Sequence, residues 1–296
     1  MTENDLARNP RSQRVENNVA ELIECLGLEE LDRDFFVGDP GRGKGRLFGG
    51  LVAAQSVVAA GRTVAPEMAL HSLHAYFLRP GGYGKPIRYT VDRIRDGRSY
   101  TTRRVVAMQA GEAIFNLSAS FAVPEDGPSH QQPMPDAVGP EGLPEMSEVR
   151  ARWFKEPPPK EIVTGTMEMR VFDDTDGDPT RKLEPTRHVW MRLNGEQPDD
   201  PLLRTALLVH ASDRTLLGTA LRPMGRTPGG DTMVTSLDHG FWLHHPPDLS
   251  GWFLYSSNSP MSHGGRALIH GAIYATDGRR IASVTQEGLV RKRRKK

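Results

Sequence analysis

The sequence predicts an α+β fold in which two copies of one unit are fused, each copy a helix wrapped by an antiparallel sheet. Two observations lead to this prediction. A helical pattern followed by strand patterns occurs in the first half of the chain and again after residue 200. Such self-similarity indicates a duplicated supersecondary unit. In addition, the first long helix is rich in Ala and Gly, whose small side chains let a sheet pack closely around it.

Two helices are expected near the start of the first copy. Residues 19–31, VAELIECLGLEEL, carry apolar side chains at helical spacing, and this helix should end near Gly27 or Leu28. Residues 47–64, LFGGLVAAQSVVAAGRTV, predict the second helix. Its composition indicates burial on most sides.

Strand patterns follow these helices. Residues 71–81 and 85–124 are rich in the apolar and β-branched residues that are typical of strands. Asp96-Gly97 and Gly111 interrupt them where tight turns are expected. The first copy is therefore predicted to be a buried helix followed by an antiparallel sheet.

The second copy repeats this order. Residues 200–221, DPLLRTALLVHASDRTLLGTAL, predict one long helix, and residues 235–246, TSLDHGFWLHHP, resemble the first strand of the first copy. Residues 264–290 then follow the order Gly-Arg, strand, Gly turn, strand, which the first copy also shows.

Between the two copies the chain is rich in Pro, Gly and acidic residues, which indicates an interdomain linker on the surface. The polar start of the chain and its basic end are expected to lie outside the folded units. The predicted division is a flexible N-terminus, a first domain, a linker, a second domain with the candidate catalytic residues and a basic tail, at 1–18, 19–124, 125–164, 165–291 and 292–296.

Composition limits the possible functions. Lys plus Arg number 38 and Asp plus Glu number 37 in 296 residues, so no broad positive field is expected to attract nucleic acid. Cys25 is the single cysteine, which excludes an intramolecular disulfide and a cysteine-rich zinc site. The polar start excludes a secretory signal, and no apolar run approaches the ~20 residues that span a bilayer. We expect a cytoplasmic protein without a metal or cofactor.

Gln286 is a polar residue on an apolar strand face. Within residues 279–291, RRIASVTQEGLVR, it points the same way as Ala282, Val284 and Val290, because alternate residues of a strand share a face. A buried amide costs free energy unless it is hydrogen-bonded. It is either a core glutamine bonded to backbone or a working group in a cavity.

Asp213 raises the same question in the long helix of the second copy, where it shares a face with Val209 and Leu216. A carboxylate there needs partners, and Gln286 together with the hydroxyl of Ser236 can supply them. The three groups can hold one water, with Asp213 as proton acceptor and the other two orienting the water. A structural network of polar side chains is the alternative.

Seven stretches of the chain resemble, in the same order, the type II acyl-CoA thioesterase family: RLFGGLVAAQ, HSLHAYFLRPG, RDGRSYTTRRV, SFAVPEDG, HASDRTLL, SLDHGFWLHHP and SVTQEGLVR. The resemblance covers nearly the whole chain, from about residue 20 to residue 291, and the seven stretches lie between residues 46 and 291. The resemblance implies a double hotdog, in which each of two fused copies is a helix wrapped by an antiparallel sheet. It also implies hydrolysis of fatty acyl-CoA to free fatty acid and CoA, so that acyl-CoA is the expected partner.

The resemblance further implies the site residues. The family uses an Asp, a Thr or Ser, and a Gln around a nucleophilic water, and these fall on Asp213, Ser236 and Gln286. Many members have Thr where this chain has Ser236, and Ser keeps the hydroxyl but lacks the methyl group that restricts the rotamer. Gln55 stands where the second copy has Asp213, so one active site per chain is expected.

Gly49 and Gly50 begin a predicted helix, where backbone N–H groups lack intrahelical acceptors. These N–H groups either bind the carbonyl oxygen of the substrate or the two glycines only permit close packing.

Two other functions fit the same fold. A hotdog-fold enoyl-CoA hydratase or dehydratase needs an Asp–His pair, for which Asp238 and His239 are the candidates, but neighbours in a strand face opposite sides. A non-catalytic acyl-CoA-binding protein would keep the apolar slot only, and the joint presence of Asp213, Ser236 and Gln286 argues against it. The open edge of a curled sheet also predicts a homo-oligomer.

Overall fold

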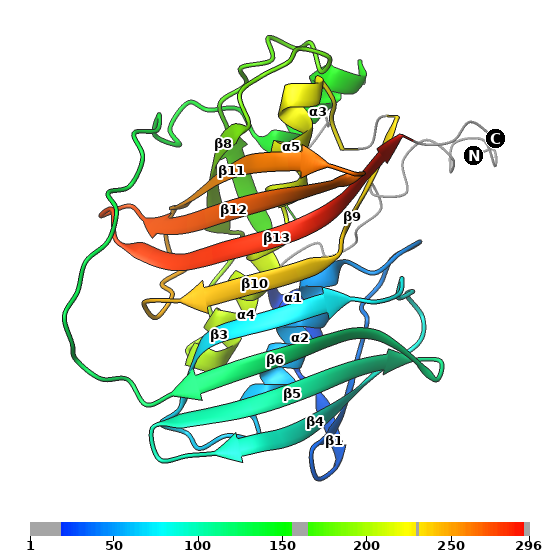
Figure 1. The fold of residues 1–296 in the computed structure, drawn as a ribbon, viewed down its shortest axis with the longest axis vertical. Coiled ribbons are helices and arrows are strands. Elements are labelled where there is room, and N and C mark those ends of the chain that lie inside the picture. The colour runs from blue at the N-terminus through cyan, green and yellow to red at the C-terminus, as the bar shows by residue number, and fades with distance from the viewer. Residues whose placement is uncertain (1–18, 156–164, 229–230, 293–296) are drawn as a thin grey trace.

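The computed structural model describes residues 19–155, 165–228 and 231–292, in which 13 strands form one antiparallel sheet that curls around two long helices (Figure 1). The predicted α+β class is confirmed. The segments 1–18 and 293–296, which hold the predicted N-terminal segment and most of the basic tail, lie outside the described residues.

The first half of the chain has the predicted order of helix and strands. Helix α1 ends one residue before Gly27, as expected, and the Asp96-Gly97 and Gly111 turns separate strands. The elements are α1 (Val19–Leu26), β1 (Glu29–Asp32), β2 (Phe35–Gly38), α2 (Gly49–Gly61), β3 (Ala69–Phe77), β4 (Ile87–Asp96), β5 (Tyr100–Gln109) and β6 (Glu112–Ala122).

The second half repeats this order. Strands β1, β2, β7, β8 and β11 extend the sheet beyond the strands expected from the sequence. The elements are α3 (Met146–Phe154), β7 (Met167–Val171), β8 (Thr186–Leu193), α4 (Pro201–Ser212), α5 (Leu216–Leu221), η1 (Arg222–Met224), β9 (Thr232–Ser236), β10 (Asp238–Leu243), β11 (Phe253–His263), β12 (Arg266–Ala275) and β13 (Arg280–Lys292).

The two halves of the sheet meet at β3 and β10. Across the described residues the order is β1-β2-β4-β5-β6-β3-β10-β13-β12-β11-β8-β7, with β9 paired to β13. Strands β3 and β10 are antiparallel, with His74 opposite Gly240. Each half of this order contains strands of one half of the chain. The domains predicted at 19–124 and 165–291 stay a prediction.

The segment predicted as a linker, 125–164, begins as an extended chain outside the sheet (Figure 1). Gln131 attaches it to the turn before β13, because its amide donates to Gly278 O at 2.8 Å and accepts the Arg280 N–H at 2.9 Å. The same segment contains α3, whose N-terminus carries a capping box formed by Glu145 and Glu148. Residues 156–164 lie outside the described part.

Helices α2 and α4 pack against each other in antiparallel orientation. A Cβ atom added to Gly50, at the start of α2, would lie 2.6 Å from the carbonyl oxygen of His210, near the end of α4. At the other end, a Cβ on Gly61 would lie 2.4 Å from Leu202 Cδ1. The small residues of α2 therefore allow this close approach, and they bring the start of α2 next to the end of α4.

The prediction of one helix over residues 200–221 is wrong, because the helix is interrupted after Ser212. The Ser212 hydroxyl lies 2.8 Å from Val209 O, so this side chain can compete with continued helical pairing in the last turn. Asp213 caps α4 with φ −85° and ψ 0°, and α5 starts at Leu216. Asp213 consequently lies at a helix end, half-buried, and not on the apolar face of a continuous helix.

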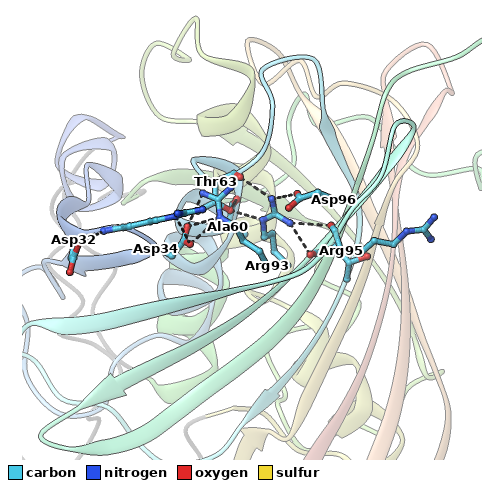
Figure 2. Close-up of polar contacts among 10 residues, drawn as sticks. Asp32, Asp34, Ala60, Thr63, Arg93, Arg95 and Asp96 are labelled. Carbon is cyan, nitrogen blue, oxygen red and sulfur yellow. Dashed lines mark hydrogen bonds and ion pairs between the residues drawn. The ribbon is translucent and has the colours of Figure 1, made fainter.

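Arg103 on β5 is a buried cation on the helix side of the sheet. Its guanidinium donates to Thr63 Oγ1 at 2.8 Å and to Thr63 O at 2.9 Å. Further bonds reach Arg95 O and Thr102 O, and Asp96 provides the ion pair (Figure 2). Because Thr63 follows α2, these bonds fix the end of α2 against the sheet.

Replacing this buried cation is expected to destabilise the fold. Arg103→Met leaves the buried carbonyl and hydroxyl acceptors without a donor, which should lower the free energy of unfolding by about 3 kcal/mol. Arg93→Met is the matched control, because Arg93 pairs with Asp34 near the surface (Figure 2), where such pairs contribute at most about 1 kcal/mol. Urea unfolding of both variants measures the difference, and equal losses would contradict the structural role of Arg103.

Candidate active site

Three polar side chains from different elements meet beside the C-terminal end of α4. Asp213 caps α4, Ser236 ends β9 and Gln286 lies within β13. The Ser236 hydroxyl donates to Asp213 Oδ1 at 3.1 Å, and Gln286 Nε2 donates to Asp213 Oδ1 at 3.2 Å and to Ser236 Oγ at 2.7 Å. The structure thus brings together all three residues that were predicted from the sequence as site residues.

Gln286 lies on the inner face of the sheet. Its side chain is fully buried, and buried residues alternate with half-buried ones along β13 through Val284, Gln286 and Val290. Asp213 and Ser236 are only half-buried. The amide therefore forms the floor of the site, and the carboxylate and the hydroxyl lie nearer to solvent.

A break at Leu237 shapes the site. The Leu237 N–H donates to Glu287 O at 2.9 Å, and Leu237 O accepts the Phe77 N–H at 2.9 Å. Strand β9 ends before this residue and β10 begins after it. In an unbroken strand, Ser236 and His239 would face opposite sides, because they are three residues apart. The break lets both side chains reach the same site.

His239 extends the set of bonded side chains. It is buried, its Nδ1 lies 2.7 Å from Gln286 Oε1 and its Nε2 lies 2.9 Å from Ser212 Oγ. Burial lowers the pKa of His239, while the nearby Asp213 carboxylate and the Gln286 bond oppose that shift. The sequence did not predict that His239 belongs to the site, because in a regular strand His239 and Ser236 would face different sides of the sheet.

Asp238 and His239, the pair considered for a hydratase, have separate partners. The Asp238 carboxylate accepts the Glu287 N–H at 2.6 Å, whereas the imidazole bonds to Gln286 and Ser212. The geometry therefore does not favour an Asp–His acid–base pair at these positions.

The buried imidazole predicts a loss of stability in mild acid. Below about pH 6.5 the unfolded chain protonates its histidines, but the folded chain resists protonation of His239 because its pKa is lowered by burial. The unfolded state then binds more protons, so the free energy of unfolding should fall as the pH drops from about 6.5 towards 5.

Urea unfolding across this pH range measures the effect. His239→Asn should show a shallower loss than the wild type, and His263→Asn, at an exposed position, serves as the control. An unchanged slope in His239→Asn would contradict the assignment.

The start of α2 faces the carboxylate. A Cβ on Gly49 would lie 2.9 Å from Asp213 Oδ2 and 2.4 Å from Phe77 Cε1, so only glycine fits here without a shift. The side chain of the N-cap residue Phe48 forms no capping bond, and the first turn of a helix leaves N–H groups without intrahelical acceptors. Gly49 therefore lies at the site, whereas Gly50 lies at the contact between α2 and α4.

Gln55, the first-copy counterpart of Asp213, has a different environment. Its side chain is fully buried, and its Nε2 donates to Cys25 O at 2.6 Å and to Asp39 O at 2.8 Å. Its Oε1 accepts the Tyr89 hydroxyl at 2.6 Å. This amide supports neighbouring backbone, which is in keeping with the prediction of one active site per chain.

The structure also bears on metals and membranes. In the described ranges, no group of three or more His, Cys, Asp or Glu side chains has the arrangement to hold a metal ion. None of the helices in the described part of the chain has the length and apolar character to cross a membrane.

Known proteins resemble this chain over most of its length. Two family models match it: acyl-CoA thioesterase at residues 172–289 and acyl-CoA thioesterase N-terminal domain at residues 39–122. Acyl-CoA thioesterase 2 of Haemophilus influenzae is 36% identical over 277 residues, which cover 91% of this chain and 96% of that protein.

Solved structures agree with this similarity. The acyl-CoA thioesterase II TesB2 from Mycobacterium marinum has a TM-score of 0.76 and 38% identity, over 92% of this chain and 97% of its own. A protein from Alicyclobacillus acidocaldarius with a hot dog fold has a TM-score of 0.73 at 19% identity, over 91% of this chain and 97% of its own, and thus shares the fold.

Proposed function

The chain belongs to the acyl-CoA thioesterase family and hydrolyses acyl-CoA thioesters, and we propose that Asp213, Ser236 and Gln286 hold the water that attacks the thioester. The double hotdog fold expected from the sequence is the fold of this family. The alternatives, a hydratase or dehydratase and a non-catalytic acyl-CoA-binding protein, are not favoured. The observation that carries the proposal is the mutual hydrogen bonding of the three side chains.

The carboxylate of Asp213 is arranged to receive a proton. Ser236 and Gln286 both donate to its Oδ1, and among the described residues no group donates to Oδ2, which lies on the side of Gly49. A water bonded to Oδ2 gives its proton to Asp213 as its oxygen attacks the thioester carbonyl carbon. Ser236 and Gln286 hold the carboxylate and direct the water.

The charge that develops on the carbonyl oxygen needs donors. The N-terminus of α2 carries partial positive charge, and Gly49, its first residue, lies next to Asp213. We propose that N–H groups of this first turn, from Gly49 and Gly50, bind the carbonyl oxygen. As the tetrahedral intermediate collapses, the C–S bond breaks and the CoA sulfur takes the proton from Asp213. The carboxylate is restored, and the products are the free acid and CoA.

Thiol release from a panel of acyl-CoAs, from short to long chains, tests the proposal together with intact-mass measurement of rapidly quenched enzyme. Direct attack by water predicts release of CoA without a pre-steady-state burst and without an acyl group on the protein. An acyl adduct on any side chain would overturn the proposed mechanism, while leaving the family assignment intact.

Removal of divalent metals is expected to leave activity unchanged. The proposed reaction uses a carboxylate, a hydroxyl, an amide and backbone N–H groups, and each acts by hydrogen bonding or proton transfer. Dialysis against a chelator followed by the thiol-release assay measures this, with a zinc hydrolase treated in parallel as the control. Loss of activity that zinc or magnesium restores would contradict the expectation.

We also propose that the protein is a homo-oligomer. Strands β1 and β7 end the sheet of the described residues, and Tyr76 on β3 is 59% exposed. Edge strands and exposed aromatic side chains favour association with another copy. Light scattering coupled to size-exclusion chromatography tests this, and a monomer at micromolar concentration would contradict it. A cytoplasmic setting also stays a prediction.

A further inference from the structure

We propose that His239 is a positioning residue, which orients the side-chain amide of Gln286 and ties it to the segment that carries Asp213. The inference rests on the proposed function, because it concerns the same site.

A glutamine amide has two orientations of nearly equal shape, and only one serves this site. Its nitrogen donates two hydrogen bonds, whereas its oxygen only accepts. With Nε2 towards Asp213 and Ser236, the amide donates to the carboxylate. The flipped amide would place its oxygen against Asp213 Oδ1, and two acceptors repel each other. A donor on the far side of the amide therefore decides the orientation.

His239 provides that donor. Its Nδ1 lies 2.7 Å from Gln286 Oε1, so the proton of a neutral imidazole must reside on Nδ1 for this bond to form. In that tautomer Nε2 is an acceptor, and Ser212 Oγ lies 2.9 Å from it. In this arrangement the single hydroxyl proton of Ser212 points to Nε2 and not to Val209 O, which is also within reach. Ser212 then donates to His239, His239 donates to Gln286, and Gln286 donates to Asp213.

These bonds close a ring through the backbone. Ser212 directly precedes Asp213, so the chain of donors begins and ends on adjacent residues. The carbonyl of Ser212 also accepts the Tyr255 hydroxyl at 2.7 Å, which holds this peptide in place. Ser212, His239 and Gln286 are all buried, so water does not compete for their bonds. A buried and closed set of this kind fixes the amide more firmly than Gln286 could be fixed by its strand alone.

The charged groups near the imidazole agree with a neutral ring. Asp213 and Asp238 both favour the protonated form, but burial is the larger influence and lowers the pKa of His239. Were the ring to gain a second proton, the Ser212 hydroxyl would turn to Val209 O, which lies 2.8 Å away.

A matched pair of variants separates the two ring nitrogens. In His239→Asn the side-chain nitrogen takes the place of Nδ1, so the bond to Gln286 is kept and the bond to Ser212 is lost. In His239→Gln the terminal amide takes the place of Nε2, so the bond to Ser212 is kept and the bond to Gln286 is lost. Each variant loses one buried hydrogen bond, and thermal unfolding should show similar losses of stability for the two.

Only His239→Gln is expected to be slow. Its kcat should fall by about 10-fold to 100-fold, the usual effect of losing an outer partner of a working group, with little change in KM. His239→Asn should lose clearly less kcat than His239→Gln, because the bond that orients the Gln286 amide is kept. Equal kcat values in the two variants, whether both fast or both slow, would overturn the inference, because a structural role does not distinguish the two nitrogens.

A Gln286→Ala background separates this inference from the proposed function. If His239 acts through Gln286, adding His239→Gln to Gln286→Ala should lower kcat no further. An additional loss of the same size would overturn the inference. If Gln286→Ala alone has the kcat of the wild type, the result contradicts the catalytic role proposed for Gln286, and not only the positioning role of His239.

The tautomer in the wild-type protein gives a readout that needs no variant to be active. The ¹⁵N shifts of the His239 ring, assigned by their absence in His239→Asn, should show a protonated Nδ1 and an unprotonated Nε2. The opposite tautomer would overturn the inference even if the variants failed to fold.

Discussion

Asp213→Asn is expected to fold normally and to lower kcat by about 10²–10⁴-fold, the usual contribution of a positioned general base. The two side chains have nearly the same shape, and the Asn oxygen can still accept from Ser236 and Gln286. What is lost is the ability to take a proton from water. KM should change little, because the group acts on the water and not on CoA or the acyl chain. Thiol release at saturating acyl-CoA measures the loss.

Asp238→Asn is the matched control for this variant. Asp238 lies near the site but its carboxylate bonds to the Glu287 N–H, so its neutralisation should leave kcat close to that of the wild type. Circular dichroism and thermal unfolding establish that both variants are folded. If folded Asp213→Asn turns over almost as fast as the wild type, Asp213 is a structural carboxylate and the proposed mechanism fails.

Gln286→Ala should have the second largest effect, a loss in kcat on the order of 10²-fold, comparable to the loss of one preorganised donor in other active sites. The amide orients both Asp213 and Ser236, so its removal misdirects the water without removing the base. Combined with Asp213→Asn, it should add little, because groups that act as one unit are not additive. Full additivity of the two losses would contradict a shared role.

Gln55→Ala is the control for removing a buried amide. Gln55 is as buried as Gln286, but it donates to backbone carbonyls of the first copy. We expect Gln55→Ala to lose stability and to keep its kcat. A loss in kcat as large as that of Gln286→Ala would indicate that any buried amide in this fold affects turnover, and it would remove the specific role of Gln286.

Helix and strand periodicity predicted much of the fold, because both depend only on residues that are close to one another in the sequence. The strand alternation around Gln286 placed its amide on the buried face, where the structure has it. The small residues of α2 predicted a helix packed closely on most sides, and Gly50 and Gly61 are where α4 approaches it. The proposed site residues depended further on a family resemblance, since the spacing of three polar residues is also typical of a structural network.

The sequence by itself determined the duplicated fold class and the face on which Gln286 lies, because helix and strand periodicity are local properties. Only the tertiary structure decided where these periodicities stop. Helix α4 ends at Ser212, and the strand that carries Ser236 breaks at Leu237, whose backbone bonds to Glu287 and Phe77 at 2.9 Å each. Such breaks are stabilised by partners far away in the chain, so no local pattern encodes them. The register of β10 on β13 places His239 beside Gln286, and the break at Leu237 brings Ser236 to the same face.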